Sequence, residues 1–524
     1  MNPSSQPTSY EEVPYESGPF AYTHPESLAT MAALFGMAPP PVERCRVLEL
    51  GCASGGNLIP MALGLPESRF VGIDLSQRQI AEGRAMVAEL NLANIELEAM
   101  SILDFRDPAE FDYIICHGVY SWVPAAVQDR ILSICAENLA PNGVAYVSYN
   151  TYPGWHVRGM IREMMCYAID RRAGPLEQVR QAREFLDFLI ASVHDAKSLY
   201  SLLLQEEAML LRTQTDSYLL HEHLEESNEP LYFYQFVERA TARGLQYLAE
   251  AKPSGAGAKL SPEAWETLKR ASANHIELEQ RLDFLHDRTF RRSLLCHERV
   301  ELQRSPPPET LRRFHLAASA KPESDQPDLT STEAEGFRAR GVSLSTNHPL
   351  VKAALVLLYE ESPRRLAFDR LWEMVLGRLG CLEPGHSAGD VRFGPADWPS
   401  LAAALLQCWG SGLVHLHLHP AKLVLEAGER PLASPLARLQ AARGGSVTNM
   451  RHYEIQITSV DAAVLRHLDG SRGRAELAET LAGLVASGEL AVEQADGAPL
   501  GDDVLRREVD SSLERLAKGA LLVG

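Results

Sequence analysis

The stretch 47–57 constrains the fold of this chain more than any other part of the sequence. Residues 45–50 form an apolar run that is typical of a buried parallel strand, and the run ends in a turn that contains Gly51 and Gly55. An apolar pattern with helical spacing follows at residues 58–65. A strand, a glycine-rich turn and a helix in this order open a doubly wound α/β domain. We therefore predict that the chain begins with an α/β, Rossmann-like sheet.

The turn carries the pattern Glu49-x-Gly51-x-x-x-Gly55 instead of the G-x-G-x-x-G of dinucleotide-binding enzymes. Gly51 permits a tight turn and leaves room for a ligand beside the main chain. A second predicted strand, 69–73, ends in Asp74, whose carboxylate is placed to accept hydrogen bonds from two ribose hydroxyls. The pattern resembles motif I of the class I methyltransferases, and this resemblance implies S-adenosylmethionine (SAM) as cofactor. The alternative is a glycine turn without a ligand.

Further SAM contacts are expected beside these motifs and in the N-terminal segment. Residues 1–26 are polar with scattered aromatic residues, so they are expected to form either a lid over the cofactor or a surface-packed arm. After the third predicted strand, 94–99, Ser101 stands where methyltransferases commonly carry an acid. The complete set of expected SAM contacts is Tyr15, His24, Glu49, Gly51, Cys52, Gly55, Asn57, Asp74, Leu75, Ser101, Ile102 and His117.

Polar and aromatic side chains follow the fourth and fifth predicted strands, 111–116 and 144–149. Because the carboxyl ends of parallel strands face the ligand, we predict that these side chains surround the methyl acceptor; packing aromatics are the alternative. Methyl transfer requires mainly the in-line positioning of a neutral nucleophile, and ring faces and an amide carbonyl suit an amine. The expected acceptor-site residues are His117, Tyr120, Trp122, Asn150, Tyr152 and Trp155, with His117 or a tyrosine as a candidate proton acceptor.

Three stretches resemble one bacterial family of class I methyltransferases that carry a methyltransferase regulatory domain. They are Ser-Trp-Val-Pro at 121–124, Tyr-Asn-Thr-Tyr-Pro-Gly-Trp at 149–155, and His-Glu-His-Leu-Glu-Glu-Ser-Asn-Glu-Pro at 221–230. The family includes protein lysine methyltransferases that act on bacterial surface proteins. The resemblance therefore implies lysine side chains of a protein as substrate. A small-molecule methyltransferase is the alternative, because one fold serves many substrates.

Three features divide the rest of the chain. They are helical spacing at 176–211, a stretch rich in Pro, Asp, Ser and Thr at 320–335, and three helical patterns after 349. Two short extended segments, 413–419 and 423–426, follow those helices and predict a winged helix. The expected domains are a methyltransferase domain with its lid (1–170), a helical regulatory or middle domain (171–304), a linker-like region (305–344), a winged-helix-like α+β domain (345–445) and a small helical domain (446–524).

A DNA-associated regulator is the main rival to an enzyme, since winged helices often bind DNA. A DNA reader clusters Lys and Arg on its recognition helix, and neither 368–379 nor 399–408 does so. The formal net charge of −19 also argues against nucleic acid as a partner. We read the C-terminal modules as docking or dimerisation units, and the long helices make a homodimer plausible.

Metal binding is a weaker alternative at two places. His221 and Glu225 share a helical face, and His415, His417 and His419 alternate along an extended segment. A zinc site needs three or four converging ligands, so we expect capping or a substrate-facing acidic rim at the first place and an exposed strand face at the second. No metal is predicted.

The chain lacks the sequence signals of an exported or membrane protein. Its eight cysteines form no C-x-x-C pair, and several lie in apolar runs, as reduced, buried thiols do. No basic region followed by an apolar stretch opens the chain, and no uncharged apolar run reaches membrane-spanning length. We expect a cytoplasmic protein with no membrane partner.

Overall fold

The computed structural model describes residues 12, 13, 15, 17–193, 197–252, 260–339, 341–380, 393–490 and 502–524. Residues 1–11 of the expected lid lie outside this part of the chain. The contacts divide the chain into two compact units. The first unit contains residues 1–17, 31–252 and 256–302, and the second contains 18–30, 253–255 and 303–524.

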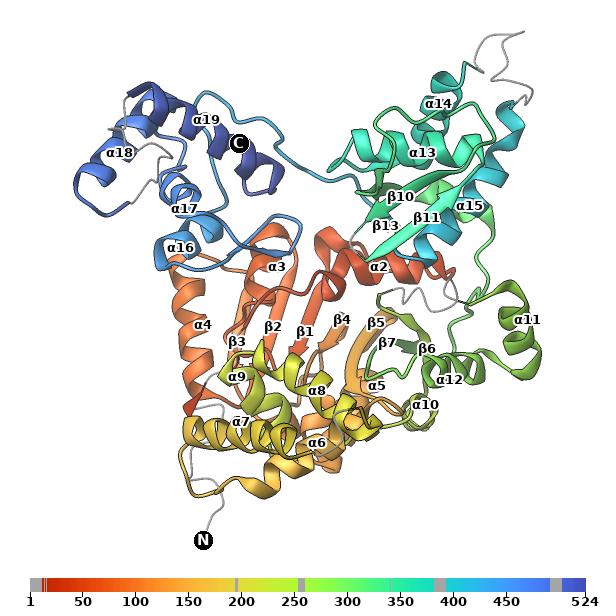
Figure 1. Cartoon of the computed structure of the whole chain (residues 1–524), viewed down its shortest axis with the longest axis vertical. Coiled ribbons are helices and arrows are strands. Elements are labelled where there is room, and N and C mark those ends of the chain that lie inside the picture. Colours follow the sequence, from red (N-terminus) through yellow and green to blue (C-terminus); the bar gives the residue numbers. More distant parts are fainter. Residues whose placement is uncertain are drawn as a thin grey trace. The chain divides into compact units, whose positions relative to one another are not determined.

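A mixed sheet forms the centre of the first unit, and the described residues contribute seven strands to it in the order β3-β2-β1-β4-β5-β7-β6 (Figure 1). The strands β1 to β5 are parallel to one another, which confirms the predicted doubly wound start. The seven strands are β1 (Arg46–Leu50), β2 (Arg69–Asp74), β3 (Ile95–Ala99), β4 (Phe111–Cys116), β5 (Leu139–Asn150), β6 (Leu245–Glu250) and β7 (Phe290–His297).

The last two strands correct the prediction that 171–304 is a purely helical domain. Strand β7 pairs antiparallel with β5, so that Phe290 lies opposite Asn150 and Arg291 opposite Tyr149, and β6 pairs with the other side of β7. Each strand is short, and the charged pair Arg291–Arg292 interrupts the apolar pattern of β7. Only pairing with β5, far away in the sequence, makes this segment a strand. The regulatory segment therefore completes the methyltransferase sheet.

The core of the first unit also crosses the predicted boundary at residue 170. Phe233, Phe236 and Leu245 pack in one cluster with Leu48 and Ile114 of the parallel strands. Helices α6 to α9 form a second core around Met165, Leu186 and Leu204, as the helical spacing predicts. The helices described up to residue 285 are α2 (Pro25–Leu34), α3 (Leu58–Gly64), α4 (Gln77–Glu89), α5 (Ala125–Glu137), α6 (Trp155–Ala168), α7 (Pro175–Ser192), α8 (Leu199–Arg212), α9 (Asp216–Leu219), a π-helical turn (Leu220–Leu224), α10 (Phe233–Thr241), α11 (Pro262–Ala271) and α12 (His275–Leu285).

The second unit contains two small sheets with three helices, followed by a C-terminal helical group. The sheet orders are β12-β8-β13 and β11-β10-β9. The strands are β8 (His315–Ala318), β9 (Lys321–Pro322), β10 (Glu335–Ala339), β11 (Val342–Thr346), β12 (Leu366–Ala367) and β13 (Val414–His417). The helices are α13 (Pro349–Glu360), α14 (Phe368–Arg378), α15 (Trp398–Gly410), α16 (Pro435–Arg443), α17 (Ser459–Leu465), α18 (Arg474–Ala486) and α19 (Asp502–Lys518), with the two-residue strands β14 (Val447–Thr448) and β15 (Glu454–Ile455).

The expectation that 305–344 is linker-like is wrong, because four of these strands come from that stretch. A buried ammonium explains how so polar a segment is ordered. Nζ of Lys352, on α13, donates hydrogen bonds to the carbonyl oxygens of Asp328 (2.6 Å), Ser331 (2.8 Å) and Glu333 (3.1 Å). Lys352 itself is only 1% exposed. Its three carbonyl partners satisfy the buried charge and fix the loop before β10.

The predicted wing is also corrected. Strand β13 forms within 413–419 but pairs with β8, whereas 423–426 forms no strand. His417 contacts Glu26 through Nδ1 at 3.3 Å, and Arg365 contacts the same carboxylate at 3.2 Å. The histidine face predicted at 415–419 is thus partly engaged within the second unit.

The described residues lack two further features. Those residues contain no group of three or more His, Cys, Asp or Glu side chains that could hold a metal ion. Among the same residues, no helix is both long and apolar enough to cross a membrane.

Candidate active site

The glycine-rich turn after β1 has the geometry that its sequence predicts. Gly51 and Gly55 both have φ angles of +77°, a region that side chains with a Cβ rarely adopt. A Cβ atom on Gly51 would lie 2.4 Å from Cγ2 of Val119, the residue that follows β4 by three positions. The turn therefore brings the main chain of motif I against the carboxyl end of β4, where a larger residue has no room.

Glu49 provides a buried carboxyl group beneath this turn. Its Oε1 accepts a hydrogen bond of 2.7 Å from Nδ2 of Asn57, the residue before α3. Its Oε2 is buried and has no hydrogen-bond partner among the described residues. Burial raises the pKa of Glu49 to about 8, because hydration no longer stabilises the charged form.

Asp74 stands at the end of β2 and organises the neighbouring backbone. Its Oδ2 accepts a hydrogen bond from the amide of Ala53 (2.9 Å), and its Oδ1 accepts one from the amide of Ser76 (2.9 Å). The side chain thus ties motif I to the N-cap residue of α4, Ser76. The adjacent Leu75 is 63% exposed, which is unusual for a large apolar side chain and leaves it available to a ligand.

The N-terminal segment reaches the same motifs within the first unit. Ser17 Oγ accepts a hydrogen bond from the amide of Gly56 (2.8 Å), and the carbonyl oxygen of Tyr15 accepts one from Nε2 of Gln79 (3.0 Å). The Tyr15 hydroxyl lies 3.4 Å from Oε1 of Glu222 in the π-helical turn. Tyr15 thus contacts α4 and the π-helical turn, and its expected role as a cofactor contact stays a prediction.

Four more predicted SAM contacts differ in their neighbours and burial: His24, Ser101, Ile102 and Cys52. His24 belongs to the second unit, where its ring centroid lies 5.3 Å from that of His452. Ser101 caps a 3₁₀ turn through its Oγ, and the neighbouring Ile102 is half-buried. Cys52 is 4% exposed, and burial is the main cause that raises the pKa of its thiol.

His117 follows β4 directly and is held by two hydroxyl groups. Its Nδ1 lies 3.0 Å from Oγ of Ser148 and 3.0 Å from the hydroxyl of Tyr146. Burial lowers the pKa of His117 to about 3, so the imidazole stays neutral at physiological pH. A ring with so low a pKa suits hydrogen bonding better than holding a proton taken from an amine.

Asn150, the last residue of β5 and a predicted acceptor-site residue, joins two loops through hydrogen bonds. Its Nδ2 donates a hydrogen bond of 3.0 Å to Oδ1 of Asn228, and its backbone amide donates to Oγ of Ser121 (2.9 Å). The amide of Glu229 in turn donates to the carbonyl oxygen of Ser121 (2.8 Å). The loops that follow β4 and β5 thus meet the segment 221–230 at one place.

The predicted aromatic residues divide into core and loop positions. Tyr120 is completely buried and packs against Phe236, which favours the packing alternative for this residue. Trp155 is 3% exposed, and its ring centroid lies 6.0 Å from that of the half-buried Trp122. Tyr152 is half-buried and stacks on His156 at 4.1 Å.

Sequence reasoning missed several residues that complete this region. Asn228, Ser121 and Glu222 come from motifs that the family resemblance had singled out, but no local pattern indicated which side chains they contact. Tyr232 follows the stretch 221–230 by two positions, and its ring lies 5.2 Å from that of Tyr152. Nothing in the local sequence predicted a contact for Gln79, because an amide side chain in the first turn of a helix is common.

The residues around motif I fit SAM. The buried Oε2 of Glu49 has no hydrogen-bond partner among the described residues, and a cationic ligand would provide a partner for it. Leu75 is exposed, and the adenosine part of such a ligand would cover its apolar side chain. Asp74 has its carboxylate at the end of the second strand, where ribose hydroxyls are commonly bound. SAM, when bound, supplies an activated methyl group on a positively charged sulfur.

Comparison with known proteins agrees with this site. A family model described as "Methyltransferase domain" matches residues 41–209, and one described as "Predicted methyltransferase regulatory domain" matches 215–297. A third, described as "PKMT, C-terminal winged helix domain", matches 429–521. The last match covers most of the predicted domain 446–524 and little of 345–445, where the sequence suggested the winged helix. The domain boundaries stay a prediction.

An uncharacterized protein of Rickettsia prowazekii (strain Madrid E) is 36% identical to this chain over 528 residues, which cover 98% of this chain and 93% of that protein. The chain belongs to the bacterial family of class I methyltransferases that carry a methyltransferase regulatory domain. The structure of PKMT2 from Rickettsia typhi in complex with AdoHcy is similar to this methyltransferase with a TM-score of 0.84 and 32% identity, over 98% of this chain and 100% of that one. A second PKMT2 structure gives a TM-score of 0.85 at 31% identity, over 97% and 100% of the two chains.

These similarities extend over almost the whole methyltransferase, including the two strands that the regulatory segment adds to the sheet. AdoHcy is what SAM becomes after its methyl group has left. With motif I, Asp74 and the matching domain models, the chain is a SAM-dependent methyltransferase.

Proposed function

We propose that this methyltransferase transfers methyl groups from SAM to lysine side chains of a protein substrate. PKMT abbreviates protein lysine methyltransferase, and the full-length similarity to PKMT2 supports this substrate class. The observation that carries the proposal is the pair Asn150–Asn228 at the end of β5, next to Trp122, Tyr152 and Trp155.

This arrangement suits an amine. Because Asn150 Nδ2 already donates to Asn228, its carbonyl oxygen is the group left to accept a hydrogen bond from an amine N–H. Ring faces stabilise the cationic character that the nitrogen gains as it bonds to the methyl carbon. The nitrogen lone pair forms the new N–C bond, the C–S bond breaks, and its electron pair stays on sulfur. The methylated ammonium then releases one proton to water.

The proposed residue roles follow from these positions. Glu49, Gly51, Gly55 and Asp74 hold the cofactor, with Tyr15 beside them, and Asn150 and Tyr152 orient the acceptor. Neutral His117 contributes hydrogen bonding. The homodimer predicted from the long helices stays a prediction.

Incubation of the purified protein with methyl-labelled SAM tests the proposal. The substrates are a mixture of synthetic peptides that each contain one lysine, the same peptides with that lysine acetylated, and a pool of bacterial metabolites. We expect label on the free-lysine peptides alone, with mass spectrometry placing it on the ε-nitrogen. Label found only in the metabolite pool would favour a small-molecule methyltransferase and overturn the proposal.

A further inference from the structure

A row of rings leads outward from the acceptor loop. Tyr152, two residues beyond Asn150, stacks on His156, and Nε2 of His156 lies 3.0 Å from the hydroxyl of Tyr232. Tyr232 continues the row, because its ring stacks on Tyr234 with centroids 5.8 Å apart. These contacts join the loop after β5 to the start of α10.

The row ends in exposed aromatic residues. The ring of Phe284, on α12, lies 5.9 Å from that of Tyr232 in a T-shaped arrangement. Phe284 is 53% exposed and Tyr234 is 40% exposed. Exposed aromatic side chains gathered at one place are typical of a binding surface. We call Tyr152, His156, Tyr232, Tyr234 and Phe284 the aromatic strip.

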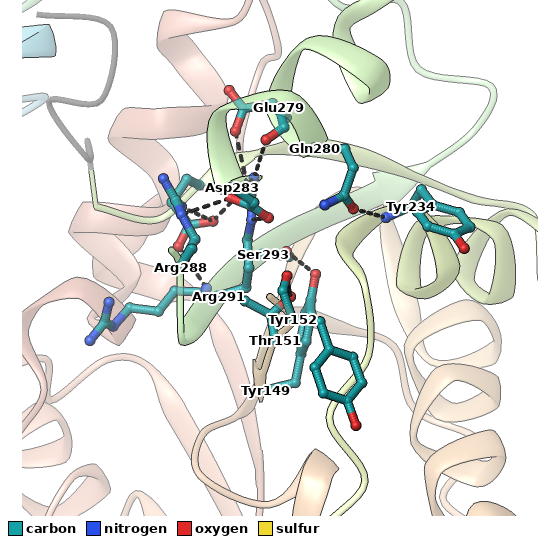
Figure 2. A network of polar contacts seen from close by, with 12 residues as sticks. Tyr149, Thr151, Tyr152, Tyr234, Glu279, Gln280, Asp283, Arg288, Arg291 and Ser293 are labelled. Carbon is teal, nitrogen blue, oxygen red and sulfur yellow. Dashed lines mark hydrogen bonds and ion pairs between the residues drawn. The ribbon is translucent and has the colours of Figure 1, made fainter. Parts of the chain in front are cut away.

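The strip is held in place by polar contacts at its base. The amide of Tyr234 donates a hydrogen bond of 3.1 Å to Oε1 of Gln280 on α12 (Figure 2). The amide of Tyr232 donates to Oε1 of Gln235 (3.0 Å). Because the backbone is already ordered, a ligand that covers these rings loses little free energy in fixing them.

The segments that adjoin the inner end of the strip, α6 and 221–230, carry exposed carboxylates. Glu163, Glu226 and Glu229 are all exposed. Glu229 is anchored to Ser121 through its amide, next to Asn228 and Asn150. Burial is the main cause that raises the pKa of Tyr152, with smaller contributions from Tyr232 and from the charge of Glu163 on α6. Negative charge at this end attracts the ammonium group of an arriving lysine.

We propose that the aromatic strip binds the polypeptide segment next to the target lysine, so that the enzyme accepts an extended chain in preference to a free amine. This inference rests on the proposed function and deepens it. The rings follow one another at centroid separations of 5.2 Å from Tyr152 to Tyr232 and 5.9 Å from Tyr232 to Phe284, so one segment of polypeptide can contact more than one of them. Aromatic side chains with exposed faces are the residues that most often anchor a partner.

Steady-state kinetics with two substrates test the inference. One substrate is a twelve-residue peptide with a single central lysine, and the other is lysine blocked at both termini. In Phe284→Ala and Tyr234→Ala, we expect the KM for the peptide to rise roughly tenfold relative to the KM for blocked lysine, because only the peptide reaches the strip. Phe284→Trp should keep the wild-type ratio, since it preserves an exposed aromatic face.

Phe188→Ala is the matched control, because Phe188 is another exposed phenylalanine (62%) of the same unit but lies on α7. This variant should behave as wild type. An unchanged KM ratio in both strip variants would overturn the inference while peptide methylation by the wild type leaves the proposed function intact. A change of oligomeric state in the strip variants, measured by light scattering, would also overturn it, because the strip would then bind a second copy. A wild type that methylates neither substrate would overturn both proposals.

Discussion

Arg291 and Asp283 form a two-pronged ion pair in which both side chains are completely buried. Nη2 of Arg291 lies 2.7 Å from Oδ1 of Asp283, and Nε lies 2.9 Å from Oδ2 (Figure 2). The pair joins α12 to β7, and Arg291 stands opposite Tyr149, one residue before Asn150. The regulatory segment thus supports the base of the acceptor loop through a buried charge.

Replacing Arg291 by Met should destabilise the protein strongly. The change removes a charged partner from both Asp283 and Glu279, and it leaves the buried Asp283 with Arg288, whose Nε lies 2.8 Å from Oδ1. Breaking a buried ion pair typically costs about 3–5 kcal/mol, and because Arg288 remains we expect a loss of about 3 kcal/mol. Thermal melting should show a lower Tm, and the double variant Arg291→Met with Asp283→Leu should recover part of the loss. Arg180→Met on α7 is the control, since Arg180 is 54% exposed and its ion pairs contribute little. Equal melting of Arg291→Met and wild type would contradict the structural role assigned to the pair.

Asp74→Ala should weaken SAM binding with little effect on the rest of the sheet. The change removes the carboxylate proposed to bind two ribose hydroxyls and releases the amides of Ala53 and Ser76. We expect a loss of about 2 kcal/mol or more, roughly thirtyfold in Kd, by calorimetric titration. Glu67→Ala, an exposed residue just before β2 at the opposite edge of the sheet, is the control. Unchanged affinity in Asp74→Ala would show that the cofactor lies elsewhere.

Asn150→Ala and Tyr152→Ala should separate catalysis from cofactor binding. Both should leave the Kd for SAM nearly unchanged and lower turnover by roughly tenfold to a thousandfold, because the acceptor loses its positioning. Asn228→Ala should lower turnover in the same direction, since Asn228 orients the Asn150 amide. Variants that melt normally, bind SAM and turn over at the wild-type rate would remove this loop from the active site.

Glu49 should make stability fall as the pH rises from about 4.5 to about 8. Burial raises the pKa of Glu49 from 4.5 to about 8 in the folded protein, so in this window the folded state keeps a proton that the unfolded state has lost. Without SAM, Glu49→Gln should flatten the decline of Tm across this window, because Gln preserves the contact with Asn57 but does not titrate. Glu96→Gln, an exposed change on β3, should keep the wild-type slope. A slope that persists in Glu49→Gln would assign the pH dependence to another group.

The local sequence determined the turn and the strand end that are predicted to bind the cofactor. Gly51 and Gly55 specify a backbone conformation that other residues rarely adopt, and Asp74 follows directly from a recognisable strand, so neighbouring residues suffice to predict both. The helices α7 and α8 were predictable for the same reason, because helical spacing repeats within a few residues.

Only the tertiary structure determined which residues lie around the loop after β5, the proposed acceptor site. Whether a charged residue is buried, or a short segment is a strand, depends on partners far away in the sequence. Arg291 and Lys352 look like surface residues until Asp283 and the carbonyl groups of 328–333 enclose them. Asn228 meets Asn150 only because β5 ends beside it. Long-range pairing, which no local pattern encodes, thus joined the regulatory segment to the methyltransferase sheet.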